Sequence, residues 1–286
     1  MLKISIITPS YNQGQYLEET IQSVLNQDYP NLEYIIMDGG STDNSVEIIE
    51  KYESRLYHWE SKPDGGQADA INKGFRLATG DILAWINSDD YYKPGILKEV
   101  AELFVHDDLK IVFGECALYQ EKSGRVKSSR VFKNAQSHKI EYSDYIIQPS
   151  SFWTRKTWEL VGELNLKLNF SFDWEWYIRA QRAGVQFQPV NKILSVYRYH
   201  EQHKTGTGGG KRELELAGIY EQYHSELLAR KYLERRTMQP KILWLNRLNI
   251  LLGLVGLKGT MDARKPLYRK HFSQLSWEEF LGIARM

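Results

Sequence analysis

Residues 82–90 have the sequence ILAWINSDD, in which five apolar residues are followed at once by four polar ones. The apolar run predicts a buried strand, and two adjacent carboxylates, Asp89 and Asp90, follow it. Carboxylates that crowd together repel one another, and a hard divalent cation prefers oxygen ligands of this kind. The pattern fits a metal site, and it fits equally well a turn with a helix N-cap, because Asp and Ser favour both.

Strand-like and helix-like patterns alternate around this stretch, four times within about 110 residues. This rhythm predicts an α/β fold with a mostly parallel sheet, right-handed crossovers and helices on both faces. Proline lacks the backbone donor that a central strand needs, so we expect Pro9 to end the first strand. The predicted strands are residues 3–8, 32–37, 57–60, 82–86 and 110–114.

The rhythm breaks after Gly114, where a hairpin around residues 122–124 is expected. Further on, the patterns predict helices over 155–162 and 173–183, short strands within 186–199, a glycine-rich hinge at 206–210 and one long helix over 211–235. We therefore predict two domains. Residues 1–210 would form the α/β domain, and residues 211–286 a helical C-terminal extension.

The composition is ordinary for a globular protein, with 42% apolar and 26% charged residues among 286. A net charge of +1 gives no electrostatic argument for nucleic-acid binding. The single cysteine, Cys116, excludes an internal disulfide framework and fits a reducing compartment. We see no signal peptide and no stretch of the ~20 apolar residues that span a bilayer, so we expect a cytoplasmic protein.

Polar residues also follow the first two predicted strands. Thr8, Pro9 and Tyr11 lie in a loop at the carboxyl edge of the sheet, where open α/β folds bind ligands. Asp38 ends the second strand, where a carboxylate can accept the N3–H of a uracil or thymine ring or cap a helix. Asp69 follows a Gly-Gly turn at the start of a predicted helix. We expect these carboxylates to gather along one edge of the sheet.

Asp173 and His200 have the chemistry of an active site. Asp173 starts a predicted helix, whose dipole stabilises its anion, and can act either as a general base or as an N-cap. His200 precedes the glycine-rich hinge, and a segment that closes there would bring it to a metal. The basic residues of this segment would meet a diphosphate, and they are Lys204, Lys211 and Arg212.

Several familiar motifs are missing from the sequence. No Gly-x-Gly-x-x-Gly turn follows the first strand, which argues against a dinucleotide oxidoreductase. The chain also has no Walker lysine loop, no Gly-x-Ser-x-Gly elbow and no Cys/His spacing that suits structural zinc.

A further pattern runs through residues 4–12, 35–43, 80–90, 148–153 and 172–175. Together these segments resemble the family 2 glycosyltransferases, which have the GT-A fold, a Rossmann-like sheet flanked by helices. The resemblance covers about residues 3–204, with the motifs in order and correctly spaced. It implies an inverting transfer of a hexosyl group from a nucleotide-sugar, commonly with Mn or Mg as cofactor.

The resemblance also implies roles for individual residues. Thr8, Pro9 and Tyr11 would line the nucleoside pocket, Asp38 would contact the base, and Asp69 would face the donor.

The implied chemical centre lies further along the chain. Asp89 matches the metal-binding carboxylate of the family's Asp-X-Asp motif, and Asp173 matches the usual catalytic base. Gln148 would lie near the acceptor or the donor sugar. The other predicted donor contacts are Asn87 and Ser88, and the other predicted metal ligands are Asp90 and His200.

The chain departs from the family pattern at two positions. Asn87 occupies the first position of Asp-X-Asp, and Ile71 stands where the family often has an arginine. Another cation must therefore meet the diphosphate, and the candidates are Lys204, Lys211 and Arg212.

From the resemblance we expect a UDP-sugar donor, with TDP and GDP left open, and a glycan or lipid-linked acceptor in polysaccharide or cell-surface glycan synthesis. A non-catalytic nucleotide-sugar-binding protein is the main alternative, for which Asn87 is the argument. A nucleotidyltransferase is a third, although residues 8–14 lack the basic residues that its loop usually carries.

Residues 242–257 are largely apolar and are followed by basic residues up to 270. This segment fits a helix in the membrane interface, which would place the enzyme at the inner face of the membrane. It also fits a helical cap packed on the domain or on a second subunit of a homo-oligomer.

Overall fold

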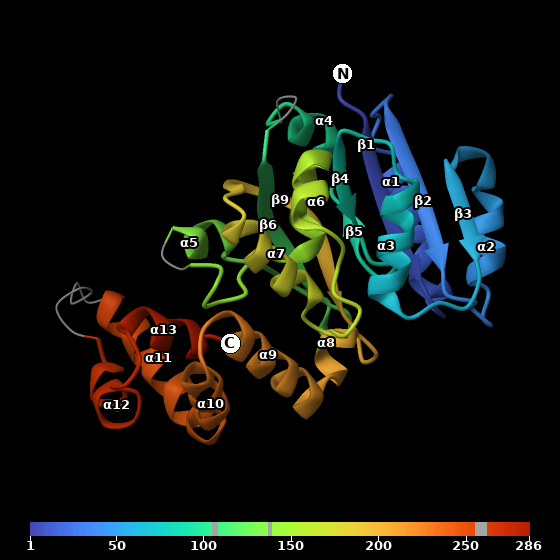
Figure 1. The fold of residues 1–286 in the computed structure, drawn as a ribbon. Helices are drawn as coiled ribbons and strands as arrows, with labels where there is room; N and C mark the ends of the chain where they lie inside the picture. Colours follow the sequence, from blue (N-terminus) through green and yellow to red (C-terminus); the bar gives the residue numbers. More distant parts are fainter. Residues whose placement is uncertain (105–107, 137–138, 255–261) are drawn as a thin grey trace. The chain divides into compact units, whose positions relative to one another are not determined.

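Two units make up the computed structural model, which describes residues 1–104, 108–136, 139–254 and 262–286. The first unit comprises Met1–Ser137 and Tyr145–Thr207, and the second comprises His138–Asp144 and Gly208–Met286. The first is built on a β-sheet and the second is helical (Figure 1).

A mixed β-sheet forms the centre of the first unit. Its strands are β1 (Ile4–Ser10), β2 (Leu32–Asp38), β3 (His58–Ser61), β4 (Ile82–Trp85), β5 (Tyr91–Tyr92), β6 (Lys110–Gln120), β7 (Arg125–Ser128), β8 (Ser151–Thr154) and β9 (Gln186–Tyr199). The strand order is β3-β2-β1-β4-β8-β6-β9-β5, with β7 paired to β6. The sheet and its flanking helices confirm the predicted α/β fold.

The first four strands of this order are parallel, since β1 pairs parallel with β2 and β4, and β2 with β3. Beyond β4 the pairing is mixed, because β8 enters antiparallel between β4 and β6 while β9 runs parallel to β6. The hairpin expected after Gly114 is present as β6 and β7. The carboxyl ends of β1, β2 and β4 therefore lie at one edge of the sheet.

Pro9 does not end the first strand, and that prediction was wrong. Pro9 lies within β1, opposite Met37 of β2. The β1–β4 ladder extends only as far as Ile7, which pairs with Trp85 and accepts a hydrogen bond from the backbone N–H of Ile86. Pro9 lies beyond this ladder, so its missing N–H removes no strand-to-strand hydrogen bond.

The short strands predicted within 186–199 form the single strand β9 instead. β9 pairs with β6 from Gln186 to Tyr199, with register shifts on either side of Glu115 that skip Asn191, Lys192 and Leu194. Gly114 permits this close pairing, because a Cβ there would lie 2.7 Å from Leu194 Cδ1 and 2.7 Å from the carbonyl oxygen of Lys192. β9 is a single strand because it has a long partner strand, β6. The sequence pattern does not reveal this pairing.

Helices cover both faces of the sheet. On one face, α1 packs through Leu17 and Ile21 into a core that contains Ile4 and Ile6 of β1. On the other face, α3 approaches β1 closely at Gly74. The helices of this unit are α1 (Gly14–Leu25), α2 (Ser45–Lys51), α3 (Gln67–Leu77), α4 (Ile96–Ala101), α5 (Val131–Ala135), α6 (Arg155–Val161), α7 (Phe172–Arg182) and α8 (Lys204–Thr207).

Aromatic rings pack the α3 face of the sheet. The rings of Trp85 and Trp153 lie 5.2 Å apart, and Trp153 lies 4.9 Å from Trp176 of α7. Phe75 of α3 lies 4.4 Å from Trp158 of α6. These contacts fix α3, α6 and α7 against β4 and β8.

The second unit contains α9 (Gly209–Tyr223), α10 (Glu226–Arg235), α11 (Gln239–Leu254), α12 (Lys265–His271) and α13 (Trp277–Ile283). The single helix predicted over 211–235 was wrong, because the chain breaks at His224 and Ser225. The Ser225 hydroxyl accepts a hydrogen bond from the backbone N–H of Leu228, which caps a new helix, α10. Within this unit the Tyr220 hydroxyl donates to the carbonyl oxygen of Tyr142. No helix of the described residues has the length and apolarity needed to cross a membrane.

We predict that Gly74→Ala destabilises the protein by about 1–3 kcal/mol, since a Cβ at this position would lie 2.5 Å from Ile7 Cγ2. Gly218→Ala is the matched control, because Gly218 is an exposed residue inside α9 with no atom within 4 Å of its added Cβ. That substitution should stabilise its helix by about 0.5–1 kcal/mol. Urea denaturation measures both changes, and a neutral Gly74→Ala variant would contradict this packing.

Candidate active site

Asp89 and His200 come together at the end of β4. The Asp89 Oδ2 atom lies 2.9 Å from His200 Nε2, and the His200 side chain is almost fully buried. The His200 ring packs on Tyr16 of α1, with ring centroids 4.6 Å apart. A carboxylate oxygen and an imidazole nitrogen are ligands that Mn²⁺ accepts, and Mg²⁺ accepts the carboxylate.

Asp90 is buried and is held by the chain on both of its carboxylate oxygens. Its Oδ1 accepts a hydrogen bond from the backbone N–H of Arg198 at 3.0 Å, and its Oδ2 accepts one from Asn87 Nδ2 at 3.3 Å. Burial, and then the neighbouring charge of Asp89, raises the pKa of the Asp90 carboxyl well above its usual value. Asp90 thus links the end of β4 to β9.

Arg198 fixes the same loop from β9, a role that was not predicted from the sequence. Its Nε donates to the carbonyl oxygen of Asp89 at 3.0 Å, and its guanidinium pairs with Glu19 of α1. The guanidinium also lies over the rings of Tyr16 and Tyr91, 4.8 and 5.4 Å from their centroids. The only sequence signal is its position two residues before His200.

Two amide side chains connect the end of β4 to Lys204. Gln67 Nε2 donates to Asn87 Oδ1 at 2.7 Å, and Lys204 Nζ donates to Gln67 Oε1 at 2.8 Å. Lys204 also lies 5.5 Å from the ring centroid of Phe172, the first residue of α7. Gln67 was missed in the sequence, although it follows the same Gly-Gly turn as Asp69.

Asp173 lies in the first turn of α7 and is half-buried. The helix begins at Phe172, so Ser171 occupies the N-cap position that was the alternative for Asp173. Arg179 anchors the helix, because it pairs with Glu175 and donates to backbone carbonyls of residues 161 and 163. This anchored helix holds Asp173 next to Phe172.

Gln148 lies under the same end of β4. Its Nε2 donates to the carbonyl oxygen of Trp85 at 2.9 Å. Its Oε1 is buried and has no hydrogen-bond partner within the described part of the chain. The Trp85 ring lies 6.3 Å from Phe172, so Gln148 and the start of α7 share a neighbour.

The carboxylate of Asp38 accepts several hydrogen bonds from its own loop. The backbone N–H and the hydroxyl of Ser41 donate to it at 2.8 and 2.6 Å, and the Ser61 hydroxyl donates at 2.6 Å. Asn12 ties this loop to the loop after β1, because its N–H donates to Ser41 Oγ. Asp38 therefore orders the turn after β2.

The three residues predicted for the nucleoside pocket differ in exposure. Thr8 and Pro9 are buried in β1, where the Thr8 hydroxyl lies 2.9 Å from that of Tyr34. Tyr11 is 61% exposed, so it alone of the three presents most of its side chain to solvent.

The remaining predicted residues lie in separate places. Asp69 of α3 accepts from the Gly65 N–H and pairs with Lys73, and these contacts lower its pKa. Ser88 is buried, and its carbonyl oxygen accepts from the Thr20 hydroxyl. Lys211 and Arg212 belong to α9 of the second unit.

Within the described residues, no group of three or more His, Cys, Asp and Glu side chains is arranged to hold a metal ion. The candidate for sharing a cation at the end of β4 is therefore the pair Asp89 and His200, whose Oδ2 and Nε2 atoms lie 2.9 Å apart. Such a pair suits a cation that shares its coordination with a phosphate and water.

The family model described as "Glycosyl transferase family 2" matches residues 5–160, more than half of the chain. The chain belongs to this family.

The chain is similar to the glycosyltransferase GlyG of Streptococcus pneumoniae, with 36% identity over 126 residues. This match covers 42% of the chain and 41% of GlyG, so it spans less than half of that relative. Among solved structures, S. aureus TarS 1-349 in complex with UDP-GlcNAc has a TM-score of 0.60 at 19% identity, covering 80% of this chain and 70% of that one.

A third similar protein is the mannosyltransferase PcManGT from Pyrobaculum calidifontis, in complex with GDP-Man and Mn²⁺. Its TM-score is 0.63 at 17% identity, and the match covers 99% of this chain and 86% of that one. At these identities the likeness to the two solved structures shows the fold, which is GT-A.

We predict that Arg198→Met lowers the free energy of unfolding by about 1–3 kcal/mol, because the charged hydrogen bonds of Arg198 hold β9 to the loop after β4. Arg76→Met is the control, because Arg76 forms an ion pair with Glu163 in which both side chains are largely exposed. Its loss should cost about 0–1 kcal/mol. Urea titration followed by tryptophan fluorescence compares them, and equal losses would contradict a structural role for Arg198.

Proposed function

We propose that the chain is an inverting glycosyltransferase that moves a hexosyl group from a nucleotide-sugar to a hydroxyl of a glycan or lipid-linked acceptor. A UDP-sugar is the first candidate donor, and cell-surface glycan synthesis is the proposed setting. The main support is the end of β4, where Asp89 lies 2.9 Å from His200 and amides lead to Lys204. The family and the nucleotide-sugars bound to TarS and PcManGT support the same activity.

Asp89 and His200 are the residues that would hold Mn or Mg in this proposal, since their oxygen and nitrogen atoms suit Mn best. When bound, the cation would act as a Lewis acid that neutralises charge on the leaving diphosphate. Asp90 stays a predicted ligand, although both of its oxygens already accept hydrogen bonds from Asn87 and Arg198.

Asp173 would act as the general base. As the acceptor oxygen attacks the anomeric carbon, the bond from that carbon to the diphosphate breaks, and a carboxylate oxygen of Asp173 takes the hydroxyl proton. General-base help of this kind contributes roughly 10²–10⁴-fold to the rate. Attack opposite the leaving group inverts the configuration at that carbon.

The other donor contacts complete the proposal. Asp38 would contact the base and Asp69 would face the donor, while Gln148 would direct its buried, unpartnered Oε1 to the sugar. The further residues proposed for the donor are Thr8, Pro9, Tyr11, Asn87, Ser88, Lys204, Lys211 and Arg212. The proposed catalytic domain is residues 1–210, and the helical extension is residues 211–286.

A non-catalytic nucleotide-sugar-binding protein is the second candidate. Asn87 favours it, because an amide replaces one carboxylate of the family's metal motif. Such a protein would bind the donor and leave it intact.

We predict that Asp173→Asn keeps donor binding and lowers transfer by roughly 10²–10⁴-fold, because an amide cannot take the proton. Asp28→Asn, an exposed position in the first unit, is the matched control and should transfer normally. Thermal shift with a panel of nucleotide-sugars and Mn²⁺ measures binding. Release of the nucleoside diphosphate measures transfer.

Two results would count against the proposal. Transfer by Asp173→Asn at the wild-type rate would remove Asp173 from the base role. Donor binding by the wild type without any transfer or hydrolysis would favour the non-catalytic candidate.

We further propose that the protein is cytoplasmic and contacts the inner face of the membrane through residues 242–270. Helix α11 is apolar on two faces: Ile242 and Leu245 are buried, while Leu243, Trp244 and Leu251 are each at least half exposed. An exposed apolar face of this kind commonly marks a contact site.

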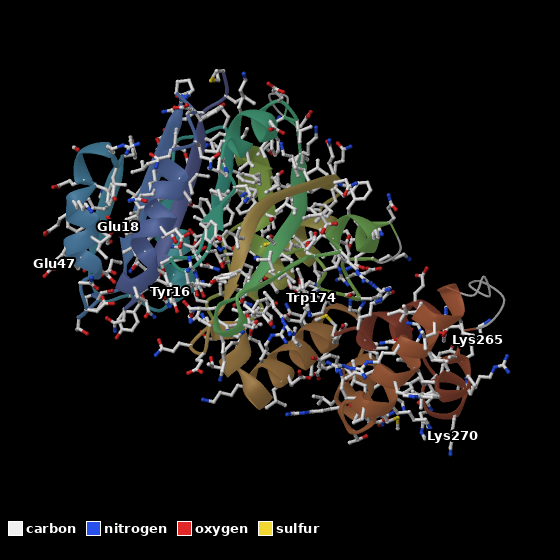
Figure 2. All side chains as sticks on the ribbon, turned by 180° about the vertical axis from the view of Figure 1, so that it is seen from behind. Tyr16, Glu18, Glu47, Trp174, Lys265 and Lys270 are labelled. Carbon is white, nitrogen blue, oxygen red and sulfur yellow. The ribbon has the colours of Figure 1, made fainter. Side chains whose placement is uncertain are left out.

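The charge near this face favours an anionic lipid surface over a second copy of the chain, since two basic faces repel. Residues 239–254 and 262–276 contain six Lys and Arg and a single acidic residue, Asp262. Lys265 and Lys270 project from α12 in Figure 2. The basic residues are Lys241, Arg247, Arg264, Lys265, Arg269 and Lys270.

We predict that the full chain sediments with phosphatidylcholine vesicles only when they contain phosphatidylglycerol. Trp244→Gln with Leu251→Gln should weaken this binding at least about tenfold, and Lys265→Gln with Lys270→Gln about thirtyfold at low salt. Leu214→Gln on α9 is the control, because Leu214 is 66% exposed and lies outside the face.

Unchanged binding by both double variants would contradict this lipid contact. The full chain could instead be a dimer in light scattering, and the Trp244→Gln and Leu251→Gln changes could make it a monomer. That result would assign the face to a homo-oligomer.

A further inference from the structure

The position of Lys204 explains both departures from the family pattern, Asn87 and Ile71. We propose that Asn87 and Gln67 are positioning residues that direct the ammonium group of Lys204 to the donor's diphosphate. Lys204 would thereby supply the positive charge for the diphosphate. The family often has an arginine for this at the position of Ile71. This inference rests on the proposed donor class.

The first step is the orientation of the Asn87 amide. Asp90 Oδ2 accepts from Asn87 Nδ2 at 3.3 Å, so the amide nitrogen of Asn87 faces Asp90. The amide oxygen of Asn87 therefore faces the opposite way, towards α3. The other oxygen of Asp90 is held as well, because its Oδ1 accepts from the Arg198 N–H at 3.0 Å.

The second step is the orientation of Gln67. Its Nε2 donates to Asn87 Oδ1 at 2.7 Å, which leaves Oε1 as the end that can accept. Lys204 Nζ donates to this Oε1 at 2.8 Å. The two amides are therefore oriented in the same sense, with each nitrogen towards Asp90 and each oxygen towards Lys204. The series of hydrogen bonds ends at the ammonium group of Lys204.

An amide at position 87 has a physical reason. An aspartate there would have no N–H for Asp90 and would add a third carboxylate beside Asp89 and Asp90. The series from Asp90 to Lys204 would then lose its first hydrogen bond. Asn87 keeps the hydrogen bond to Asp90 and so keeps the orientation of both amides. Compared with an aspartate, it also lowers the negative charge where a diphosphate would bind.

The position of Lys204 suits this role. Its Nζ is within hydrogen-bond distance of the first residue of α3 and lies 5.5 Å from the ring of Phe172, next to Asp173. The oxygen that accepts this hydrogen bond from Lys204 belongs to the neutral amide of Gln67. A diphosphate oxygen would gain a charge-assisted hydrogen bond there.

The test is isothermal titration of the full chain with UDP, TDP, GDP and the three matching monophosphates in the presence of Mn²⁺. Lys204→Met should weaken binding of the preferred diphosphate about tenfold or more and that of the matching monophosphate much less. Lys204→Arg should restore most of the preference for diphosphate. Gln67→Leu and Asn87→Leu should also lower the preference for the diphosphate, but by less than Lys204→Met does, because Lys204 keeps its charge.

Lys62→Met is the matched control, since Lys62 is a largely exposed lysine that pairs with Glu60 in the same unit. Its diphosphate preference should equal that of the wild type. If the wild type prefers the diphosphate and Lys204→Met preserves this preference, the inference is wrong while the proposed function stands. If Lys204→Met loses the preference and Gln67→Leu does not, the positioning role is wrong. If the wild type binds none of these nucleotides, the proposed function itself fails.

Discussion

The buried carboxylate of Asp90 is the constraint on which the rest of the site depends. Its side chain accepts hydrogen bonds from β9 and from Asn87, and its carbonyl oxygen accepts the Thr20 hydroxyl of α1 at 2.6 Å. A buried carboxylate is costly unless such partners satisfy it. The side chain of Asp90 holds β9 and Asn87 together, and its backbone carbonyl holds α1 to the same loop, in which Asp89 faces His200.

Much of the fold could be predicted, because buried parallel strands and their helices leave clear apolar patterns. The errors arose where a distant partner or a local hydrogen bond decides the outcome. Pro9 stays within β1 because the β1–β4 ladder ends before it, and β9 is continuous because β6 pairs with it on both sides of the register shifts. The break at Ser225 depends on one capping hydroxyl, which an otherwise helical pattern conceals.

The candidate site could be predicted in part for a similar reason. Asp89 and His200 were expected to share a cation, because a carboxylate at a strand end and a histidine before a glycine-rich segment are visible as residue types. Gln67 and Arg198 were missed, since their roles arise only from contacts across the fold. Arg198 pairs with Glu19, which is 179 positions away in the chain.

The most direct test is a crystal structure of the protein with UDP or GDP and Mn²⁺, with anomalous diffraction to locate the manganese. The account predicts a single strong anomalous peak in contact with Asp89 and His200, with the diphosphate between this peak and Lys204 Nζ. A manganese peak away from this pair, or a diphosphate bound far from Lys204, would contradict it.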